Sequence, residues 1–176
     1  MKLKPYIGQA AIASRVKELA GRIEEFIGSE EAVLAANLKG SFMFFSDIVR
    51  EIGGRNVSVD FLSTEGYSGA CSTGNVKITR DFSLDVNGKK VVLIEDIVDT
   101  GLTLSHLIHY IKEVHKPSEL KVCVLLDKPS RRKTEVHVDF TGFEISDEFV
   151  VGYGLDYNEK LRNLPYIALL ELDEKI

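Results

Sequence analysis

Acidic, hydroxyl and glycine residues gather directly after a short, fully apolar run at residues 91–94 (VVLI). They are Glu95, Asp96, Asp99, Thr100, Gly101 and Thr103. An apolar stripe at helical spacing begins beside them, and the exposed N–H groups and dipole of a helix start favour a phosphate. Two adjacent carboxylates repel each other and lose solvation, a cost that a ligand with hydroxyls or a metal ion offsets. The segment therefore indicates a site for ribose 5-phosphate, with the ribose hydroxyls toward Glu95 and Asp96.

A simpler interpretation of the same residues is an acid-rich helix start that Asp99 caps. The spacing matches neither the phosphate loop GxxxxGK[ST] nor the dinucleotide loop GxGxxG. A position directly after a buried strand favours the site, because ligands of open α/β sheets bind beyond the carboxyl ends of the strands.

Hydrophobic periodicity predicts the elements that position these residues. Helical spacing predicts helices near 7–27, 42–52 and 104–114, with Ser41 as a possible cap of the second. Residues 32–38 are a short apolar run, and residues 64–75 are a glycine-rich loop of the kind that is usually mobile or functional. Strand-like segments are 57–63, 76–84, 91–94, 120–127, 136–145, 149–156 and 166–172. The alternation predicts an α/β fold with a mostly parallel, twisted sheet flanked by helices.

Bulk properties narrow the class of protein. The 176 residues fit one domain, 1–176, and the net charge of −5 with a pI of about 5.4 argues against nucleic-acid coating. No apolar run reaches the roughly 18 residues of a membrane helix, and the start lacks signal-peptide features, so we expect a cytoplasmic protein without membrane partners. The two cysteines, Cys71 and Cys123, suggest neither a disulfide framework nor a zinc site.

The segment VVLIEDIVDTGLTL (91–104) resembles the phosphoribosyl pyrophosphate motif of type I phosphoribosyltransferases. LLDKPSRR (125–132) and FVVGYGLDYNEKLRNLPYI (149–167) resemble the purine-binding segments of the hypoxanthine-guanine members. LKGS (38–41) is similar to their pyrophosphate loop, and GYSGACSTG (66–74) to their mobile loop. The resemblance implies the type I fold with a small hood and a mobile loop. It also implies purine salvage: hypoxanthine or guanine plus phosphoribosyl pyrophosphate gives IMP or GMP and pyrophosphate, with Mg²⁺ as cofactor.

The resemblance assigns roles around the phosphoribosyl group. It implies that Glu95 and Asp96 bind the ribose hydroxyls, partly through Mg²⁺, and that Asp99 is the general base at N7 of the purine. The residues implied for the 5′-phosphate are Thr100, Gly101 and Thr103. Those implied for pyrophosphate are Lys39, Gly40 and Arg162, and Asp156 is implied for a second Mg²⁺. In the family the bond between Leu38 and Lys39 can be cis.

The resemblance also assigns the purine site. It implies that Phe149 stacks on the base, that Lys128 meets the 6-oxygen, and that backbone groups near Val150 contact the other edge of the ring. The residue types agree, because a 6-oxo group needs a donor and a purine needs a flat apolar surface, which Phe149 or Tyr153 can supply. Simpler interpretations are Phe149 as core and Lys128 as a solvated loop cation. The run 131–133 (RRK) is likewise interpreted as a solvated turn.

Two departures from the family pattern affect the expected lid and phosphate loop. Gly66 stands where a serine usually precedes the loop tyrosine, here Tyr67, and Leu102 stands where some members carry lysine. The four histidines, at 106, 109, 115 and 137, show no metal-ligand spacing and are expected to be structural or exposed.

Three functions remain open at this stage. The first is the hypoxanthine-guanine enzyme, acting on small-molecule substrates as a homo-oligomer, dimer or tetramer, with FMFF (42–45) in the core or an interface. The second is a regulatory RNA-binding protein on the same scaffold, against which the acidic pI argues. The third is a phosphoribosyltransferase for another base: Lys128 and the 149–167 segment oppose a pyrimidine, whereas xanthine stays open.

Overall fold

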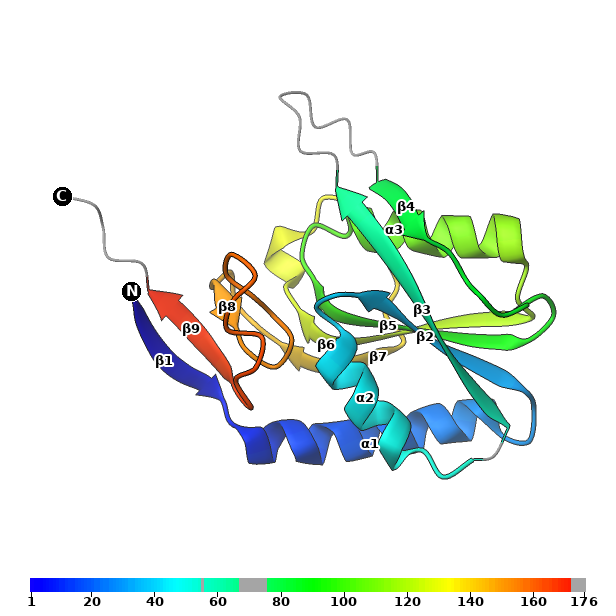
Figure 1. Ribbon diagram of the computed structural model, residues 1–176, viewed down its shortest axis with the longest axis horizontal. Helices are drawn as coiled ribbons and strands as arrows, with labels where there is room; N and C mark the ends of the chain where they lie inside the picture. The colour runs from blue at the N-terminus through cyan, green and yellow to red at the C-terminus, as the bar shows by residue number, and fades with distance from the viewer. Residues whose placement is uncertain (55, 67–75, 172–176) are drawn as a thin grey trace.

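A computed structural model describes residues 1–54, 56–66 and 76–171 of the chain. Its main feature is a six-stranded sheet in the order β4-β3-β2-β5-β6-β7, in which β4 alone runs antiparallel to its neighbour (Figure 1). The strands are β2 (Ala32–Leu38), β3 (Val57–Gly66), β4 (Val76–Arg80), β5 (Lys90–Val98), β6 (Glu119–Asp127) and β7 (Phe140–Glu144). The predicted α/β fold with a mostly parallel sheet is confirmed.

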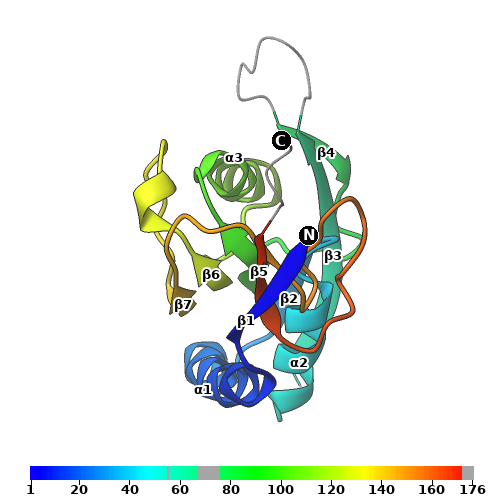
Figure 2. The same cartoon turned by 90° about the vertical axis from the view of Figure 1, so that its left-hand side faces the viewer.

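Helices cover both faces of this sheet (Figure 2). One face carries α1 (Gln9–Ile27) and α2 (Phe42–Glu51), and the other carries α3 (Leu102–Tyr110), which continues into a π-helical turn, η1 (Ile111–His115). Within the described ranges, no helix is both long and apolar enough to cross a bilayer.

Strand β5 shows why its sequence is an unbroken apolar run. Val92 and Ile94 belong to the core cluster beneath α1 and α2, whereas Leu93 belongs to the cluster that contains Leu104 and Leu107 of α3. Both faces of the strand are therefore buried, as in other parallel sheets that carry helices on each side.

A small second sheet lies at one end of the molecule and forms the expected hood (Figure 1). It pairs β1 (Lys2–Ile7) and β8 (Val150–Val151) with the central strand β9 (Ile167–Glu171), all antiparallel. Strand β1 was not predicted, and the helix expected near 7–27 begins only at Gln9. Strand β1 is stabilised by pairing with β9 at the far end of the chain, which no local pattern reveals.

Several predicted boundaries also need correction. The expected strand 136–145 begins only at Phe140, and the expected strand 149–156 shortens to Val150–Val151. A turn replaces the rest of that second segment, because Gly152, Tyr153 and Gly154 adopt positive φ angles of 99°, 49° and 102°. The strand expected at 76–84 ends at Arg80.

Strands β2 and β5 are neighbours at the centre of the sheet and pair in parallel, with Ala36 opposite Ile94. From β2 the chain continues to β3, toward one edge of the sheet, and from β5 it continues to β6, toward the opposite edge. A crevice opens outside the carboxyl ends of the strands at such a switch point, where open α/β sheets bind their ligands. The fold therefore places the residues after β2 and the acidic segment of β5 at one site.

Candidate functional site

Glu95 and Asp96 form the acidic pair of the crevice, and burial disfavours the charged form of both carboxyl groups. Glu95 is 5% exposed, and its Oε1 accepts a hydrogen bond of 3.0 Å from Nδ2 of Asn37 on β2. Burial and repulsion from Asp96 raise the pKa of Glu95 well above its ordinary value, although the Asn37 bond opposes this. Burial also raises the pKa of Asp96 to about 6, even though nearby Arg162 lowers it. Groups with raised pKa values of this kind are typical of sites that await a cation or hydroxyl-bearing ligand.

A cavity of about 270 Å³ runs from this acidic pair to the start of α3. Its lining contains the six residues predicted from the sequence together with Asn37: Asn37, Glu95, Asp96, Asp99, Thr100, Gly101 and Thr103. The structure thus brings the predicted phosphoribosyl residues into one cavity.

The shape of the turn that begins α3 depends on a glycine conformation and on backbone hydrogen bonds. Gly101 has φ 82°, and a Cβ added there would lie 2.5 Å from the carbonyl oxygen of Thr134. The carbonyl of Thr100 accepts hydrogen bonds from the backbone N–H groups of Lys133 and Thr134, at 2.9 and 3.1 Å. Gly101 is the N-cap residue of α3 and supplies no side-chain cap, while the N–H of Leu102 donates a 3.4 Å hydrogen bond to Oγ1 of Thr100. The alternative in which Asp99 caps this helix is therefore wrong, and the cavity reaches the first turn of the helix at Thr103 and Leu104, where helix N–H groups favour an anion.

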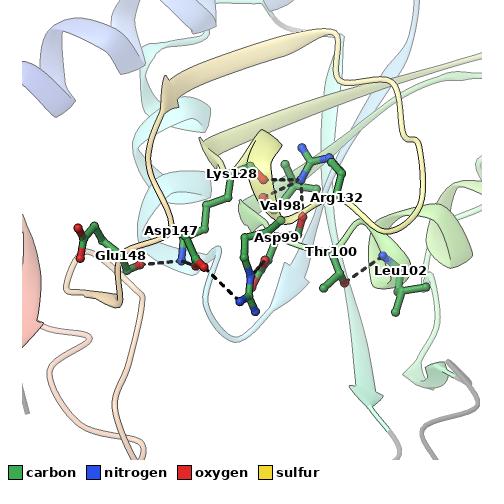
Figure 3. Close-up of polar contacts among 9 residues, drawn as sticks. Val98, Asp99, Thr100, Leu102, Lys128, Arg132, Asp147 and Glu148 are labelled. Carbon is green, nitrogen blue, oxygen red and sulfur yellow. Dashed lines mark hydrogen bonds and ion pairs between the residues drawn. The ribbon is translucent and has the colours of Figure 1, made fainter.

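Asp99 pairs with an arginine that sequence reasoning misjudged. Nε of Arg131 lies 2.9 Å from Oδ1 of Asp99, and its Nη1 lies 3.3 Å from Oδ2 of Asp147. Arg132 instead donates to the carbonyl of Val98 at 3.0 Å and to that of Asp99 (Figure 3). The interpretation of residues 131–133 as a solvated turn is wrong for Arg132, which is half-buried, whereas Arg131 is exposed and pairs with Asp99 at the surface. Local sequence does not show which loop either arginine faces.

Lys128 is a buried lysine beside the predicted purine segment. Its residue exposure is 7%, and its Nζ donates a 2.6 Å hydrogen bond to the carbonyl of Glu148 and lies 4.0 Å from Asp147 (Figure 3). The solvated-cation interpretation is wrong. Phe149 is 53% exposed, which rejects its interpretation as core, and its ring meets Tyr157 edge-on. An exposed aromatic ring beside a buried ammonium group is a plausible surface for a purine.

Tyr153 cannot serve as the stacking surface that we considered as an alternative. It is 7% exposed, and its hydroxyl donates a 2.5 Å hydrogen bond to Asp47 of α2. Burial and that bond raise the pKa of Tyr153 far above its ordinary range. Val150 is buried in β8 and pairs with Leu169.

Positive side chains meet on the other side of the crevice. Lys39 follows β2, and Arg162 belongs to the loop before β9. Glu159 joins them, its Oε2 lying 3.1 Å from Nζ of Lys39 and 3.3 Å from Nη2 of Arg162. Arg162 also pairs with Asp156 at 2.9 Å and donates to the carbonyl of Gly154 at 2.8 Å. The cations predicted to contact pyrophosphate are therefore adjacent.

Close packing ties this cationic group to the acidic pair. The peptide bond between Leu38 and Lys39 is cis. A Cβ added to Gly40 would lie 1.7 Å from Oδ2 of Asp96, and one added to Gly154 would lie 2.0 Å from the carbonyl oxygen of Gly40. Only glycine fits at these two positions, so Gly40 lies in van der Waals contact with both Asp96 and Gly154.

The donor set fits Mg²⁺ that shares its ligands with a substrate. Within residues 1–54, 56–66 and 76–171 no three His, Cys, Asp or Glu side chains converge as an all-protein cage. Mg²⁺ usually takes one or two carboxylates and completes its octahedron with water and substrate oxygens. Glu95 and Asp96 supply such carboxylates, and a cation would relieve the repulsion that raises the pKa of Glu95. The carboxylate of Asp156 is engaged by Arg162 and by the backbone N–H of Glu159.

Some predicted features fall elsewhere. Tyr67 and Cys71 lie outside the described residues, as do residues 67–74 of the expected mobile loop (66–74). The glycine-rich loop expected at 64–75 begins later than predicted, because β3 continues to Gly66. Ser41 is the N-cap residue of α2, as predicted, but its side chain makes no capping hydrogen bond, because its hydroxyl donates back to the carbonyl of Asn37. His115 is structural, as expected: it lies 2.8 Å from Asp81, at the far end of α3.

Sequence reasoning missed three functional candidates: Asn37, Arg131 and Glu159. Asn37 interrupts the apolar run 32–38 at its carboxyl end, a position that could have marked it. Glu159 lies within the purine-like segment, but nothing in its spacing shows that it faces Lys39, 120 positions away.

Known proteins resemble this chain in sequence and in fold over nearly its whole length. The model of the phosphoribosyl transferase domain matches residues 7–158. The hypoxanthine-guanine phosphoribosyltransferase of Aquifex aeolicus is 45% identical over 97% of this chain and 96% of its own length. The hypoxanthine phosphoribosyltransferase of Escherichia coli K12 is 45% identical over 96% of each chain. A crystal structure of a hypoxanthine-guanine phosphoribosyltransferase from Bacillus anthracis superposes with a TM-score of 0.92 at 45% identity, covering 97% of this chain and 100% of that one.

Proposed function

Because this chain belongs to the hypoxanthine-guanine phosphoribosyltransferases, members of the phosphoribosyl transferase domain family, we propose that it transfers the phosphoribosyl group to a 6-oxopurine. Hypoxanthine or guanine and phosphoribosyl pyrophosphate become IMP or GMP and pyrophosphate. The observation that carries this proposal is the cavity in which the acidic pair meets the start of α3, with the buried Lys128 bonded through its backbone N–H to Val98 of the cavity wall.

Substrate binding divides the crevice into three parts. The 5′-phosphate is placed on the N–H groups at the start of α3, with hydroxyl donors from Thr100 and Thr103. The ribose hydroxyls are placed at Glu95 and Asp96. The pyrophosphate group is placed against Lys39, Gly40 and Arg162, which supply the positive charge that an acidic protein lacks elsewhere.

The purine is placed between the α3 loop and the hood. Phe149 stacks on the ring, Lys128 donates to the 6-oxygen and the backbone near Val150 meets the opposite edge. The hydrogen bond from Lys128 to the carbonyl of Glu148 and the proximity of Asp147 hold the ammonium group at this position before substrate arrives. A 6-amino group, as in adenine, would present a donor to this donor and is disfavoured.

The reaction exchanges one bond at the anomeric carbon for another. The bond from C1 to the pyrophosphate oxygen breaks, and its electron pair leaves with pyrophosphate. The N9 lone pair of the purine forms the new bond to C1, and Asp99 accepts the proton from N7. Bound Mg²⁺, held by Glu95 and Asp96 with a second ion near Asp156, would neutralise charge on the leaving group. Lys39 and Arg162 stabilise the same developing charge electrostatically.

Further proposals concern the setting of the enzyme. We propose that the chain acts as one domain in the cytoplasm, because its phosphorylated substrates do not cross membranes. We also propose a homo-oligomer, dimer or tetramer, because Phe42 and Val59 expose apolar surface, at 37% and 45%. Phe44 and Phe45 of FMFF are core residues, so only the start of α2 is available for an interface.

A spectrophotometric assay with hypoxanthine, guanine, xanthine and adenine tests the function. Nucleotide should form from hypoxanthine or guanine with phosphoribosyl pyrophosphate and Mg²⁺, and excess chelator should abolish it. The absence of product from all four bases at substrate saturation would reject the proposal, and activity that persists in chelator would reject the metal.

A further inference from the structure

Glu159 occupies the place where an anionic leaving group has to bind. Its Oε2 lies 3.1 Å from Nζ of Lys39 and 3.3 Å from Nη2 of Arg162, so one carboxylate oxygen bridges both cations. A carboxylate in this position carries negative charge, as a phosphate oxygen does, and accepts hydrogen bonds from the same two cationic donors. Both cations belong to the pyrophosphate part of the proposed function, and the inference below rests on that proposal.

The backbone holds Glu159 at this position. Asn158 and Glu159 adopt left-handed φ angles of 50° and 61°, in a turn closed by the pairing of Tyr157 with Lys160. The N–H of Glu159 donates a 2.8 Å hydrogen bond to Asp156, whose carboxylate pairs in turn with Arg162. Left-handed conformations at non-glycine residues carry a cost that sites of function often accept. The turn therefore directs the carboxylate toward Lys39.

We propose that Glu159 is a positioning residue that acts as an internal competitor of pyrophosphate. In the free protein it holds Lys39 and Arg162 at the spacing that a pyrophosphate oxygen requires. When pyrophosphate or phosphoribosyl pyrophosphate binds, its carboxylate gives up both cations, and on product release it takes them back.

Exposure makes this exchange feasible. The side chains of Lys39 and Glu159 are 68% and 64% exposed, so neither has to be drawn from a buried environment. Arg162 is only 19% exposed and keeps its bonds to Asp156 and Gly154, so it stays in place while Glu159 leaves. Its Nε is buried without a partner among the described residues. Exposed ion pairs correspond to factors of about 1.4 to 5 each in an equilibrium constant.

The test measures binding of inorganic pyrophosphate with Mg²⁺ by isothermal titration calorimetry. Glu159→Gln keeps the shape and removes the charge, and we expect its dissociation constant to fall about two- to tenfold. Glu159→Asp keeps the charge but shortens the reach, so the bridge is lost and the constant should fall about twofold or more. Glu171→Gln, which removes the same charge from the hood strand β9, should bind like wild type.

Steady-state kinetics supplies a readout that a purely structural role would not change. In Glu159→Gln the KM for phosphoribosyl pyrophosphate and the inhibition constant of product pyrophosphate should both fall, while the KM for hypoxanthine stays within about twofold. Wild-type pyrophosphate affinity in Glu159→Gln would overturn the inference. So would tighter binding in Glu159→Gln with wild-type binding in Glu159→Asp, because that pattern indicates only long-range repulsion.

The same experiment separates this inference from the proposed function. A wild-type protein that forms IMP and binds pyrophosphate, with an unaltered Glu159→Gln variant, defeats the inference alone. A wild-type protein that neither forms nucleotide nor binds pyrophosphate defeats both.

Discussion

Replacing Lys128 with methionine separates recognition of the base from the rest of the reaction. Methionine keeps the length and apolar stem of the buried lysine and removes its charge and its hydrogen-bond donors. In the structure those donors serve the carbonyl of Glu148 at 2.6 Å and, by our proposal, the 6-oxygen of the purine. The substitution therefore has one effect on stability and another on catalysis.

The two magnitudes follow from these two bonds. A hydrogen bond from a charged donor is worth about 1.5–3 kcal/mol, so kcat/KM for hypoxanthine should fall by about 10- to 150-fold. Loss of the donor to the Glu148 carbonyl should lower the free energy of unfolding by about 1–3 kcal/mol. The KM for phosphoribosyl pyrophosphate should change by less than about twofold, because Lys128 lies outside the phosphate and ribose parts of the crevice.

Lys133→Met is the matched control, because it removes the same charge from the same loop at an exposed position. Initial rates with hypoxanthine varied at saturating phosphoribosyl pyrophosphate, and the reverse, give the two specificity constants, and urea unfolding gives the stability. If Lys128→Met loses no more kcat/KM for hypoxanthine than Lys133→Met, the assignment of Lys128 to the 6-oxygen is wrong. Equal losses for both substrates would show a structural lysine.

Three other substitutions test separate parts of the argument, and Gly21→Ala is the control for Gly154→Ala. Asp99→Asn should lower kcat by about 10²- to 10⁴-fold with little change in unfolding, and turnover close to wild type would reject Asp99 as the base. Gly154→Ala should lower Tm by about 2–4 °C or more and raise the KM for phosphoribosyl pyrophosphate, because its Cβ would meet the Gly40 carbonyl at 2.0 Å. Gly21→Ala, on the exposed face of α1 with nothing within 4 Å of its Cβ, should be neutral or stabilising. Burial favours a higher pKa at Asp60, but hydrogen bonds from Phe61, Leu84 and Ser83 outweigh it and lower the pKa below 3.8. Its ionised form thus stabilises the fold above about pH 4, so Asp60→Asn should be less stable at pH 7 by about 1–3 kcal/mol. This deficit should shrink as pH falls from about 4 through the lowered pKa, and a pH-independent difference in urea unfolding would contradict the assignment.

The sequence predicted the features of this site that depend on neighbours along the chain. The run VVLI and the acids after it identified β5 and its cavity because both faces of that strand are buried, which makes the pattern unambiguous. The assignment of Lys128 to the purine stays a prediction, and its burial comes from contact with Glu148 and could not be read locally. Strand β1 was missed because β9, more than 160 positions away, provides its hydrogen-bond partners.

The contacts of Arg131, Arg132 and Tyr153 that sequence reasoning missed have a common physical origin. Each lies in an irregular segment whose direction is set by turns with positive φ or by bonds to another loop. Tyr153 has φ 49°, and its hydroxyl bonds to Asp47 of α2. Arg131 reaches Asp99 across 32 positions. Sequence periodicity describes regular elements, and it carries no information about the side-chain direction of such segments.

The exposure of the charged groups distinguishes those that are fixed from those that must exchange partners. Lys128 has a side-chain exposure of 9% and keeps its bond to Glu148, so its position is set before a purine arrives. Arg131 and Asp99 are 45% and 40% exposed, and by our proposal their ion pair has to open for Asp99 to reach N7. Exposed pairs contribute about 0–1 kcal/mol, whereas a buried charge that loses its partner costs several. Exchange at the exposed positions is therefore inexpensive, and the crevice can remain charge-balanced when empty at only a small cost in substrate affinity.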